Sequence, residues 1–351
     1  MRYAQVNTTY YCGVDLHAKE MYITVMDKMG TPLLQQKMPN HFETFKQYLQ
    51  PYLPDVAVAA ESTCFYYWLA DACRDAGISF YLGHALYMKA ISGGKVKNDK
   101  LDSQKIADLL RANLFPLAYP YPKEMRAVRD LLRRRHFFVR RRASVFIHLQ
   151  VLCQQYGIID LPAKLVKNKL ERRRLLALFD NPDIGMQVES DLQFIEALDP
   201  IIRELELHIL QQAKYHNWVD YQLLQTIPGV GQMLSLIILY ETHDVRRFAT
   251  VQRYSSYAGV VKCERTSGGK SYASKNTKIR NAYLKWAFGE IIIKAQAEER
   301  IAKLYQRLKV KYGPGRAKSI IAHRFAVAAY FMLKNKQAFD VDKFVRSSKY
   351  N

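Results

Sequence analysis

The stretch Tyr10–Met38, YYCGVDLHAKEMYITVMDKMGTPLLQQKM, decides the fold of the first part of the chain. It contains three short apolar runs, Tyr11–Leu16, Met21–Met26 and Pro32–Met38, and the residues Asp27–Gly30 have the composition of a turn. Short apolar runs bounded by turn residues are typical of β-strands. Three strands joined so closely predict an antiparallel meander.

Beyond the meander, helical and strand-like patterns alternate. An α/β layered domain with its later strands parallel is the arrangement that such alternation favours. We expect this domain to span residues 1–122. The elements predicted after the meander are a helix Phe42–Leu49, a strand Val56–Ala60, a helix Phe65–Ala76, a strand Ile78–Leu82 and a helix that begins near Leu101.

The strand signal disappears from Lys123 onward. Apolar residues at helical spacing predict two long helices, Lys123–Tyr156 and Met186–His216, which we interpret as a helical hairpin or coiled-coil arm over residues 123–218. A mainly α-helical part, residues 219–351, completes the chain. The fold class expected is therefore α/β plus all-α.

Composition points to nucleic acid as the partner. The 351 residues carry 53 Lys and Arg against 32 Asp and Glu, a formal charge of +21. An excess this large attracts polyanions, with an anionic membrane surface as the second candidate. No apolar run is long enough to span a bilayer, and the N-terminus has no export signal, so we expect no membrane partner and a cytoplasmic location. The five scattered cysteines lack zinc-site spacing and are expected to be reduced and mostly buried.

Arginine is concentrated in the first long helix, with eight residues between Arg126 and Arg142. In a chain of this charge we favour contact with nucleic-acid phosphates over a merely solvated face. The residues expected to make it are Arg133, Arg134, Arg135, Arg140, Arg141 and Arg142.

Four carboxylates stand at places where a buried strand or a helix start would bring them to one edge of the sheet. Asp15 and Glu61 close apolar strands, where an unpartnered charge is costly, and Asp99 and Asp102 are three apart on one predicted helix. Two divalent ions acting on a phosphodiester need several such hard oxygen ligands, with Mg²⁺ the expected ion. For each acid alone, a helix cap or a surface charge is the alternative. We interpret His17 as a turn histidine without a catalytic role, with assistance to a metal site as the alternative.

Two glycine-containing stretches follow in the last third of the chain. Ile227–Gly231, with Gly229 and Gly231, resembles the hairpin of helix-hairpin-helix modules, whose amides face a DNA phosphate, and a purely structural turn is the alternative. Ser267 stands beside two glycines in a cationic stretch, which suits a phosphate cradle, a serine nucleophile or a flexible loop. The residues of this second stretch expected to contact nucleic acid are Lys262, Arg265, Gly268, Gly269 and Lys270.

In this order along the chain, these motifs resemble bacterial insertion-sequence transposases of the DEDD type, the group that includes the pilin-gene invertase Piv and recombinases guided by a bridge RNA. The motifs that carry the resemblance are G-V-D-x-H at Asp15, Glu61, D-x-x-D at Asp99 and Asp102, I-P-G-V-G at 227–231 and S-G-G-K at 267–270. The resemblance implies an N-terminal RNase H-like (RuvC-like) domain, a helical coiled-coil arm and a mainly α C-terminal transposase domain.

The resemblance also implies a chemistry and partners. Asp15, Glu61, Asp99 and Asp102 would position Mg²⁺, with Mn²⁺ as the other candidate ion, and Ser267 would become joined to DNA. The expected function is a bacterial, nucleoid-associated transposase or recombinase that cuts and rejoins DNA at element ends and at the target. A structured guide RNA and a homodimer or homotetramer are further implied partners. The rivals are a junction-resolving, metal-dependent endonuclease and a non-enzymatic nucleic-acid-binding protein.

Overall fold

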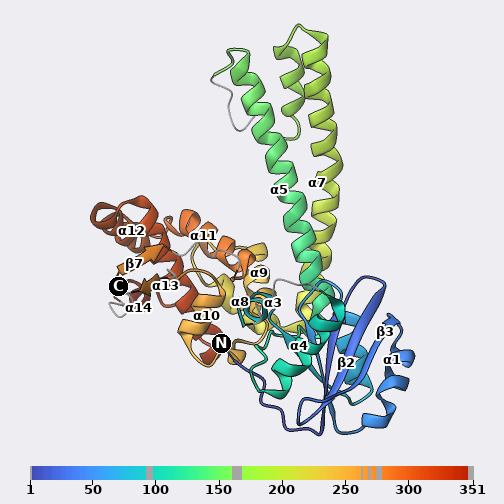
Figure 1. Ribbon diagram of the computed structural model, residues 1–351. Coiled ribbons are helices and arrows are strands. Elements are labelled where there is room, and N and C mark those ends of the chain that lie inside the picture. Colours follow the sequence, from blue (N-terminus) through green and yellow to red (C-terminus); the bar gives the residue numbers. More distant parts are fainter. Residues whose placement is uncertain are drawn as a thin grey trace. The chain divides into compact units, whose positions relative to one another are not determined.

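The computed structural model describes residues 2–91, 98–159, 168–261, 264–267, 270–273 and 279–346 (Figure 1). The chain divides into two compact units, Met1–Lys123 and Glu124–Asn351. The division of the second unit at residue 218, and that of the whole chain into three domains, stays a prediction.

A five-stranded sheet forms the centre of the first unit, in the order β3-β2-β1-β4-β5. Strands β1 and β2 are antiparallel, as are β2 and β3, whereas β1–β4 and β4–β5 are parallel. The predicted meander and the parallel later strands are thus both present. The strands are β1 Tyr10–Leu16, β2 Glu20–Asp27, β3 Pro32–Pro39, β4 Val56–Glu61 and β5 Ser79–Gly83.

Helices cover both faces of this sheet, and each face has its own core. Phe45 and Leu69, from two helices on one face, pack in a cluster with Val14 and Val58 of the sheet. On the other face, Leu110 packs with residues such as Ala59. The helices of this unit are α1 Phe42–Leu49, the short 3-10 helix Gln50–Tyr52, α2 Tyr67–Asp75, α3 Ala85–Ile91 and α4 Asp99–Arg111.

Two long helices open the second unit, α5 Lys123–Gln155 and α7 Pro182–His216, with a 3-10 helix Arg172–Leu178 between them. They lie side by side (Figure 1), and Leu152 of α5 shares a buried cluster with Leu192 of α7. Both predicted long helices are therefore present. A coiled-coil geometry for the pair stays a prediction.

The remainder of the second unit is mainly helical, around a core that contains Tyr254, Phe288 and Phe325. One two-stranded antiparallel sheet, β6 Glu264–Ser267 with β7 Lys270–Ala273, stands where a loop was one of the expectations. No helix among the described residues is long and apolar enough to cross a membrane. The helices are α8 Trp218–Gln225, α9 Gln232–Thr242, the 3-10 helix Val245–Arg247, α10 Val251–Tyr257, α11 Ala282–Ala295, α12 Glu299–Tyr312, α13 Pro314–Asn335 and α14 Val341–Arg346.

Candidate active site

Asp15 and Asp99 meet because helix α4 packs directly against strand β1. Asp15 is the penultimate residue of β1, and Asp99 is the first residue of α4. The start of α4 is fixed by Asn98, whose side chain accepts a hydrogen bond from the backbone amide of Lys100 at 3.0 Å. Gly13 permits the close approach, since a β-carbon there would lie 2.1 Å from the carbonyl oxygen of Ser103.

The imidazole of His17 stands between these two carboxylates. Its Nε2 lies 3.3 Å from Oδ2 of Asp15 and 3.5 Å from Oδ1 of Asp99. One ligand atom of each of the three residues lies within 4.8 Å of the others. His17 is half exposed, whereas the Asp15 side chain is only 18% exposed, so the group opens to solvent on the histidine side.

Asp102 follows Asp99 by almost one helical turn on the same helix. Its Oδ1 accepts from Lys105 Nζ at 3.1 Å in an i,i+3 pair. Asp102 is close enough to Asp15 to disfavour ionisation of that carboxyl. Both members of the predicted D-x-x-D pair therefore act on Asp15.

Burial raises the pKa of the Asp15 carboxyl, and the neighbouring Asp99 and Asp102 raise it further, although His17 opposes them. Carboxylates crowded in this way repel one another when ionised. A divalent cation placed among them would relieve that repulsion. The electrostatics of the group thus fit a cation-binding role.

Glu61 occupies the same edge of the sheet from the neighbouring strand. It is the last residue of β4, which runs parallel to β1, and Val14 of β1 pairs with Ala60 of β4. The next positions along the two strands are Asp15 and Glu61, so both acids lie at the C-terminal ends of adjacent parallel strands. The group of ligand atoms within 4.8 Å, among the residues that the structure describes, contains neither Glu61 nor Asp102.

The donor set has the chemistry that Mg²⁺ or Mn²⁺ requires. Hard divalent ions prefer carboxylate oxygens, and an imidazole nitrogen is a better ligand for Mn²⁺ than for Mg²⁺. Asp15, Asp99 and His17 supply two such carboxylates and one imidazole within reach of a single ion. The residues present therefore fit a divalent cation.

Ser267 is the last residue of β6 and pairs in register with Lys270, the first residue of β7. Two residues therefore separate the strands, as in the commonest β-hairpins. For Arg265, Ser267 and Lys270 the structure describes the backbone alone. Lys262, Gly268 and Gly269 lie outside the described residues.

The six arginines of α5 that were expected to contact nucleic acid divide into two groups by their contacts. Arg133, Arg135 and Arg142 are bound to carboxylates of the same unit, with Arg133 Nε 2.7 Å from Glu241 Oε1 and Arg142 Nη1 2.6 Å from Asp199 Oδ1. The other three are exposed at the surface. Two of these flank the 43% exposed ring of Phe137, at 5.7 and 5.0 Å from its centre. The exposed arginines are Arg134, Arg140 and Arg141.

The I-P-G-V-G stretch forms the turn between α8 and α9. Gly229 has φ +81°, and a β-carbon there would lie 2.6 Å from the backbone nitrogen of Ala295. Only glycine suits such a position. Gly231 is the N-cap residue of α9. Packing alone explains Gly229, and the predicted phosphate contact of the two glycines stays a prediction.

Two segments of the chain match models of one family of known proteins. Residues 12–158 match the family model DEDD_Tnp_IS110, described as a transposase, and residues 221–306 match the model described as "Transposase IS116/IS110/IS902 family". The chain belongs to the IS110-type DEDD transposase family. The resemblance expected from the motifs is thereby confirmed.

Individual IS110-type relatives are distant in sequence. The transposase for insertion sequence element IS1111A of Coxiella burnetii is 26% identical over 54% of this chain and 52% of that protein, so this match spans about half of the relative. The transposase for IS1328 of Yersinia enterocolitica is 22% identical over 74% of this chain and 75% of its own length. The mini-circle putative transposase for IS117 of Streptomyces coelicolor is 22% identical, with 95% of each chain covered.

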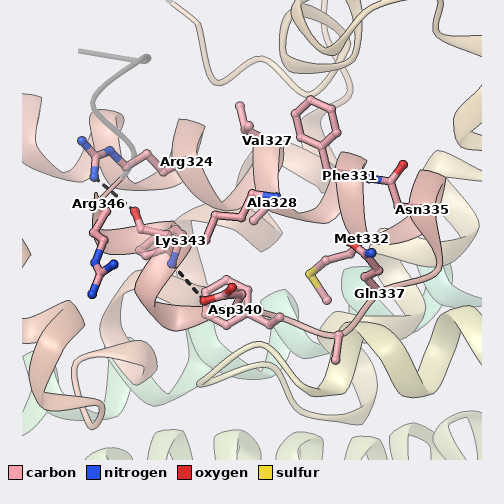
Figure 2. A pocket seen from close by; sticks show the side chains of 13 residues that line it. Arg324, Val327, Ala328, Phe331, Met332, Asn335, Gln337, Asp340, Lys343 and Arg346 are labelled. Carbon is pink, nitrogen blue, oxygen red and sulfur yellow. Dashed lines mark hydrogen bonds between the residues drawn. The ribbon is translucent and has the colours of Figure 1, made fainter.

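The two regions that match the IS110-type models contain the predicted site residues. The four acids and the α5 arginines fall within residues 12–158, and Ser267 falls within 221–306. A cavity of about 960 Å³ lies outside both regions, between α13 and α14. Figure 2 shows its lining, where Arg324 Nη1 donates to the carbonyl of Phe344 at 3.3 Å and the Lys343 amide donates to Asp340. None of the predicted site residues lines this cavity.

His17, interpreted from the sequence as a turn histidine with assistance to a metal site as the alternative, lies in the candidate group with Asp15 and Asp99. Its position two residues after Asp15, just beyond the end of β1, was the available signal. A strand that ends at Leu16 leaves the following side chain free to turn back toward the strand's own acid. The backbone amide of His17 donates to the carbonyl of Glu20 at 3.0 Å, which fixes this tight connection to β2.

Proposed function

We propose that this IS110-type protein is a DNA transposase that cuts and rejoins DNA strands at the ends of a mobile element. The observation that carries the proposal is the convergence of Asp15, Asp99 and His17 at one edge of the sheet. A transposase needs a means of activating phosphodiester chemistry, and crowded carboxylates with a raised pKa at Asp15 suit a divalent ion. We assign the first unit to the RNase H-like, RuvC-like fold, because its mixed sheet supports this group.

Within this proposal each acid has a defined task. Asp15 and Asp99 would hold the ion, and His17 would complete the group from the solvent side. Glu61 and Asp102 add carboxylates from the neighbouring strand and from the next turn of α4. When bound, Mg²⁺ or Mn²⁺ would stabilise negative charge on the phosphodiester oxygens. Lys105 would then release Asp102, whose oxygen it binds at 3.1 Å in this structure.

Ser267 supplies the attacking hydroxyl in this account. Its Oγ forms a bond to phosphorus while the bond from phosphorus to one sugar oxygen breaks, and the hydroxyl proton leaves Oγ as the departing oxygen gains a proton. A sugar hydroxyl then attacks the phosphorus joined to Ser267, the bond from phosphorus to Oγ breaks, and the DNA strands are rejoined. The position at the end of β6, beside a two-residue connection, suits a residue that must reach a substrate.

The exposed arginines of α5 are the proposed DNA contacts of the arm. Arg134, Arg140 and Arg141 are available to phosphates, and the ring of Phe137 offers a surface on which a base could stack. The three arginines bound to carboxylates are already neutralised. A structured guide RNA, and a homodimer or homotetramer that brings two sites to two strands, belong to the same proposal.

The test uses labelled DNA that carries the element ends, incubated with Mg²⁺ and the full-length protein, its Ser267→Ala variant and its Asp15→Asn variant. We expect strand cleavage with a protein–DNA adduct for the wild type, loss of both for Asp15→Asn, and loss of the adduct for Ser267→Ala. Cleavage by Ser267→Ala at the wild-type rate would instead identify a metal-dependent endonuclease. Binding without cleavage by all three proteins would identify a non-enzymatic nucleic-acid-binding protein.

A further inference from the structure

A buried carboxylate on α9 joins three elements of the second unit. Glu241 is 3% exposed, and both of its oxygens accept from the guanidinium of Arg133, with Nε at 2.7 Å and Nη2 at 2.8 Å. Asn281 Nδ2 donates to Glu241 Oε2 at 2.7 Å. A buried carboxylate is retained when such charge-assisted bonds satisfy it. Glu241 is thus fixed in position from α5 and from the start of α11.

The residues around Glu241 also mark both ends of the segment that carries Ser267. Tyr257 is the last residue of α10, and Asn281 is the N-cap of α11. The Asn281 amide donates to the carbonyl of Tyr257 at 2.7 Å, and Asn281 Nδ2 lies 3.1 Å from the Tyr257 hydroxyl. The Tyr257 hydroxyl in turn donates to the backbone carbonyl of Glu241 at 3.4 Å. The two ends of the segment are therefore held against each other and against Glu241.

Two further contacts hold the paired ends of the segment 258–280, which we call its base. Gly259 has φ +67°, and a β-carbon there would lie 2.6 Å from Cδ of Arg280, so the chain crosses closely just beyond the paired ends. The guanidinium of Arg247 lies 4.5 Å from the centre of the Tyr257 ring and donates to the carbonyl of Thr242 at 3.0 Å. Position and direction of the chain at residue 257 are thus set by α9.

We propose that Glu241 is a positioning residue that anchors the base of the segment 258–280 and thereby places Ser267 for attack on DNA. This inference rests on the proposed role of Ser267. Glu241 acts through Asn281 and Tyr257 and touches no substrate itself. Arg133 couples the same anchor to the long helix α5, which gives this arginine a structural task distinct from the phosphate contact expected from the sequence.

The expected fall in the rate of adduct formation follows from the geometry of the reaction. Misplacing a reacting group by about 1 Å can lower a rate by about 100-fold. Glu241→Gln keeps the shape of the side chain but removes its charge, and its amide nitrogen would face a donor, either Asn281 or Arg133. The base of the segment should loosen while the core around it remains.

The test compares three variants of the full-length protein. Glu241→Gln removes the anchor, and Asn281→Ser removes the side-chain bonds to Glu241 and to the Tyr257 hydroxyl while retaining the backbone bond to Tyr257 and a good N-cap for α11. Glu206→Gln is the matched control, because it removes the carboxylate bound to Arg135 on the same helix α5. The readouts are hydrogen exchange of residues 258–280, the rate at which the Ser267–DNA adduct forms, and DNA affinity.

We expect faster exchange in residues 258–280 and an adduct rate about 100-fold lower for Glu241→Gln, and at least about 10-fold lower for Asn281→Ser, with DNA affinity within about 2-fold. Glu206→Gln should match the wild type in all three readouts. Unchanged exchange and rate in Asn281→Ser would overturn the inference, even if Glu241→Gln fails to fold. A wild type without an adduct at Ser267 would refute the proposed function, whereas the exchange measurement would still decide whether Glu241 anchors the segment.

Discussion

The carbonyl oxygen of Ser103 occupies the place that a β-carbon on Gly13 would need, at 2.1 Å from its ideal position. Helix α4 therefore lies against the backbone of β1 with no side chain between them. The fully buried hydroxyl of Ser103 also lies 2.7 Å from that of Thr24 on β2, which fixes the rotation of α4 about its axis. This contact brings Asp99 to Asp15.

Gly13→Ala should separate α4 from β1. The added methyl group meets the backbone, so we expect a loss of about 1–3 kcal/mol in the free energy of unfolding, together with a loss of Mg²⁺ binding. Gly289→Ala is the matched control, since no atom lies near a β-carbon at that helical position. It should stabilise the protein by about 0.5–1 kcal/mol. Equal melting temperatures for Gly13→Ala and the wild type would contradict the close packing.

Asp15→Asn should stabilise the protein when no divalent ion is present. Because burial and two acids raise the pKa of Asp15, the folded state binds its proton more tightly than the unfolded chain. Protonated Asp15 therefore contributes stability that is fully present below pH 3.8, the ordinary pKa of an aspartic acid. This stability is lost as the pH rises through the raised pKa of Asp15 in the folded state. In EDTA at pH 7 we expect a melting temperature about 2–4 °C higher for the variant, with a difference that disappears toward pH 3. A lower melting temperature at pH 7 would show that the ionised form is not penalised.

With divalent ions present, the wild type should have a higher melting temperature than Asp15→Asn. An ion that binds the folded state alone raises the melting temperature of the wild type with increasing concentration. Asp15→Asn should show no such rise, because it lacks one of the closest ligands. Thermal melts over a series of Mg²⁺ concentrations provide the measurement, and a parallel rise in both proteins would contradict the assignment of Asp15.

His17→Ala should weaken Mn²⁺ binding by about 10-fold or more. The imidazole nitrogen lies 3.3 and 3.5 Å from the two carboxylates, and nitrogen ligands favour Mn²⁺ over Mg²⁺. We therefore expect Mn²⁺ to bind the wild type more tightly than Mg²⁺, and the variant to lose most of that preference. Calorimetric titration with each ion tests this. His41→Ala, which changes an exposed histidine of the same unit, is the control.

Replacing the exposed arginines together should lower DNA affinity in a salt-dependent way. Each phosphate contact contributes about 0.9 to the slope of the logarithm of affinity against the logarithm of salt concentration. Arg134→Gln, Arg140→Gln and Arg141→Gln combined should reduce that slope, measured by fluorescence anisotropy, by up to about 2.7. Asp199→Asn, which removes the carboxylate that binds Arg142, should change the melting temperature and leave the salt slope unchanged. An unchanged slope in the triple variant would exclude these three arginines as phosphate contacts.

Much of the first unit could be predicted from the sequence, because strand and helix patterns there agree with the packing. The meander and the parallel strands β4 and β5 follow from short apolar runs, and Phe42–Leu49 coincides with α1. The helix expected at Phe65 begins at Tyr67, and Phe65 is exposed just before it. The helix expected near Leu101 begins at Asp99, because the cap at Asn98 decides its start.

The site itself could be predicted only in part. Paired acids at strand ends indicated where carboxylates gather, but the role of His17 depends on a turn geometry that spacing does not specify. The division of the α5 arginines depends on carboxylates distant in sequence, such as Glu241 and Asp199, and no local pattern reveals such partners. The hairpin β6–β7 had a local signal, two glycines between residues 267 and 270, which the polar composition concealed.

The central claim is that Asp15 and Asp99 hold a divalent ion, and anomalous diffraction from crystals grown with Mn²⁺ tests it most directly. We predict a peak between the two carboxylates, about 2.2 Å from an oxygen of each, with the nearest nitrogen that of His17. The same crystals of Asp15→Asn should show no peak there. A wild-type map with no Mn²⁺ at these carboxylates, under conditions in which the protein cleaves DNA, would contradict the account.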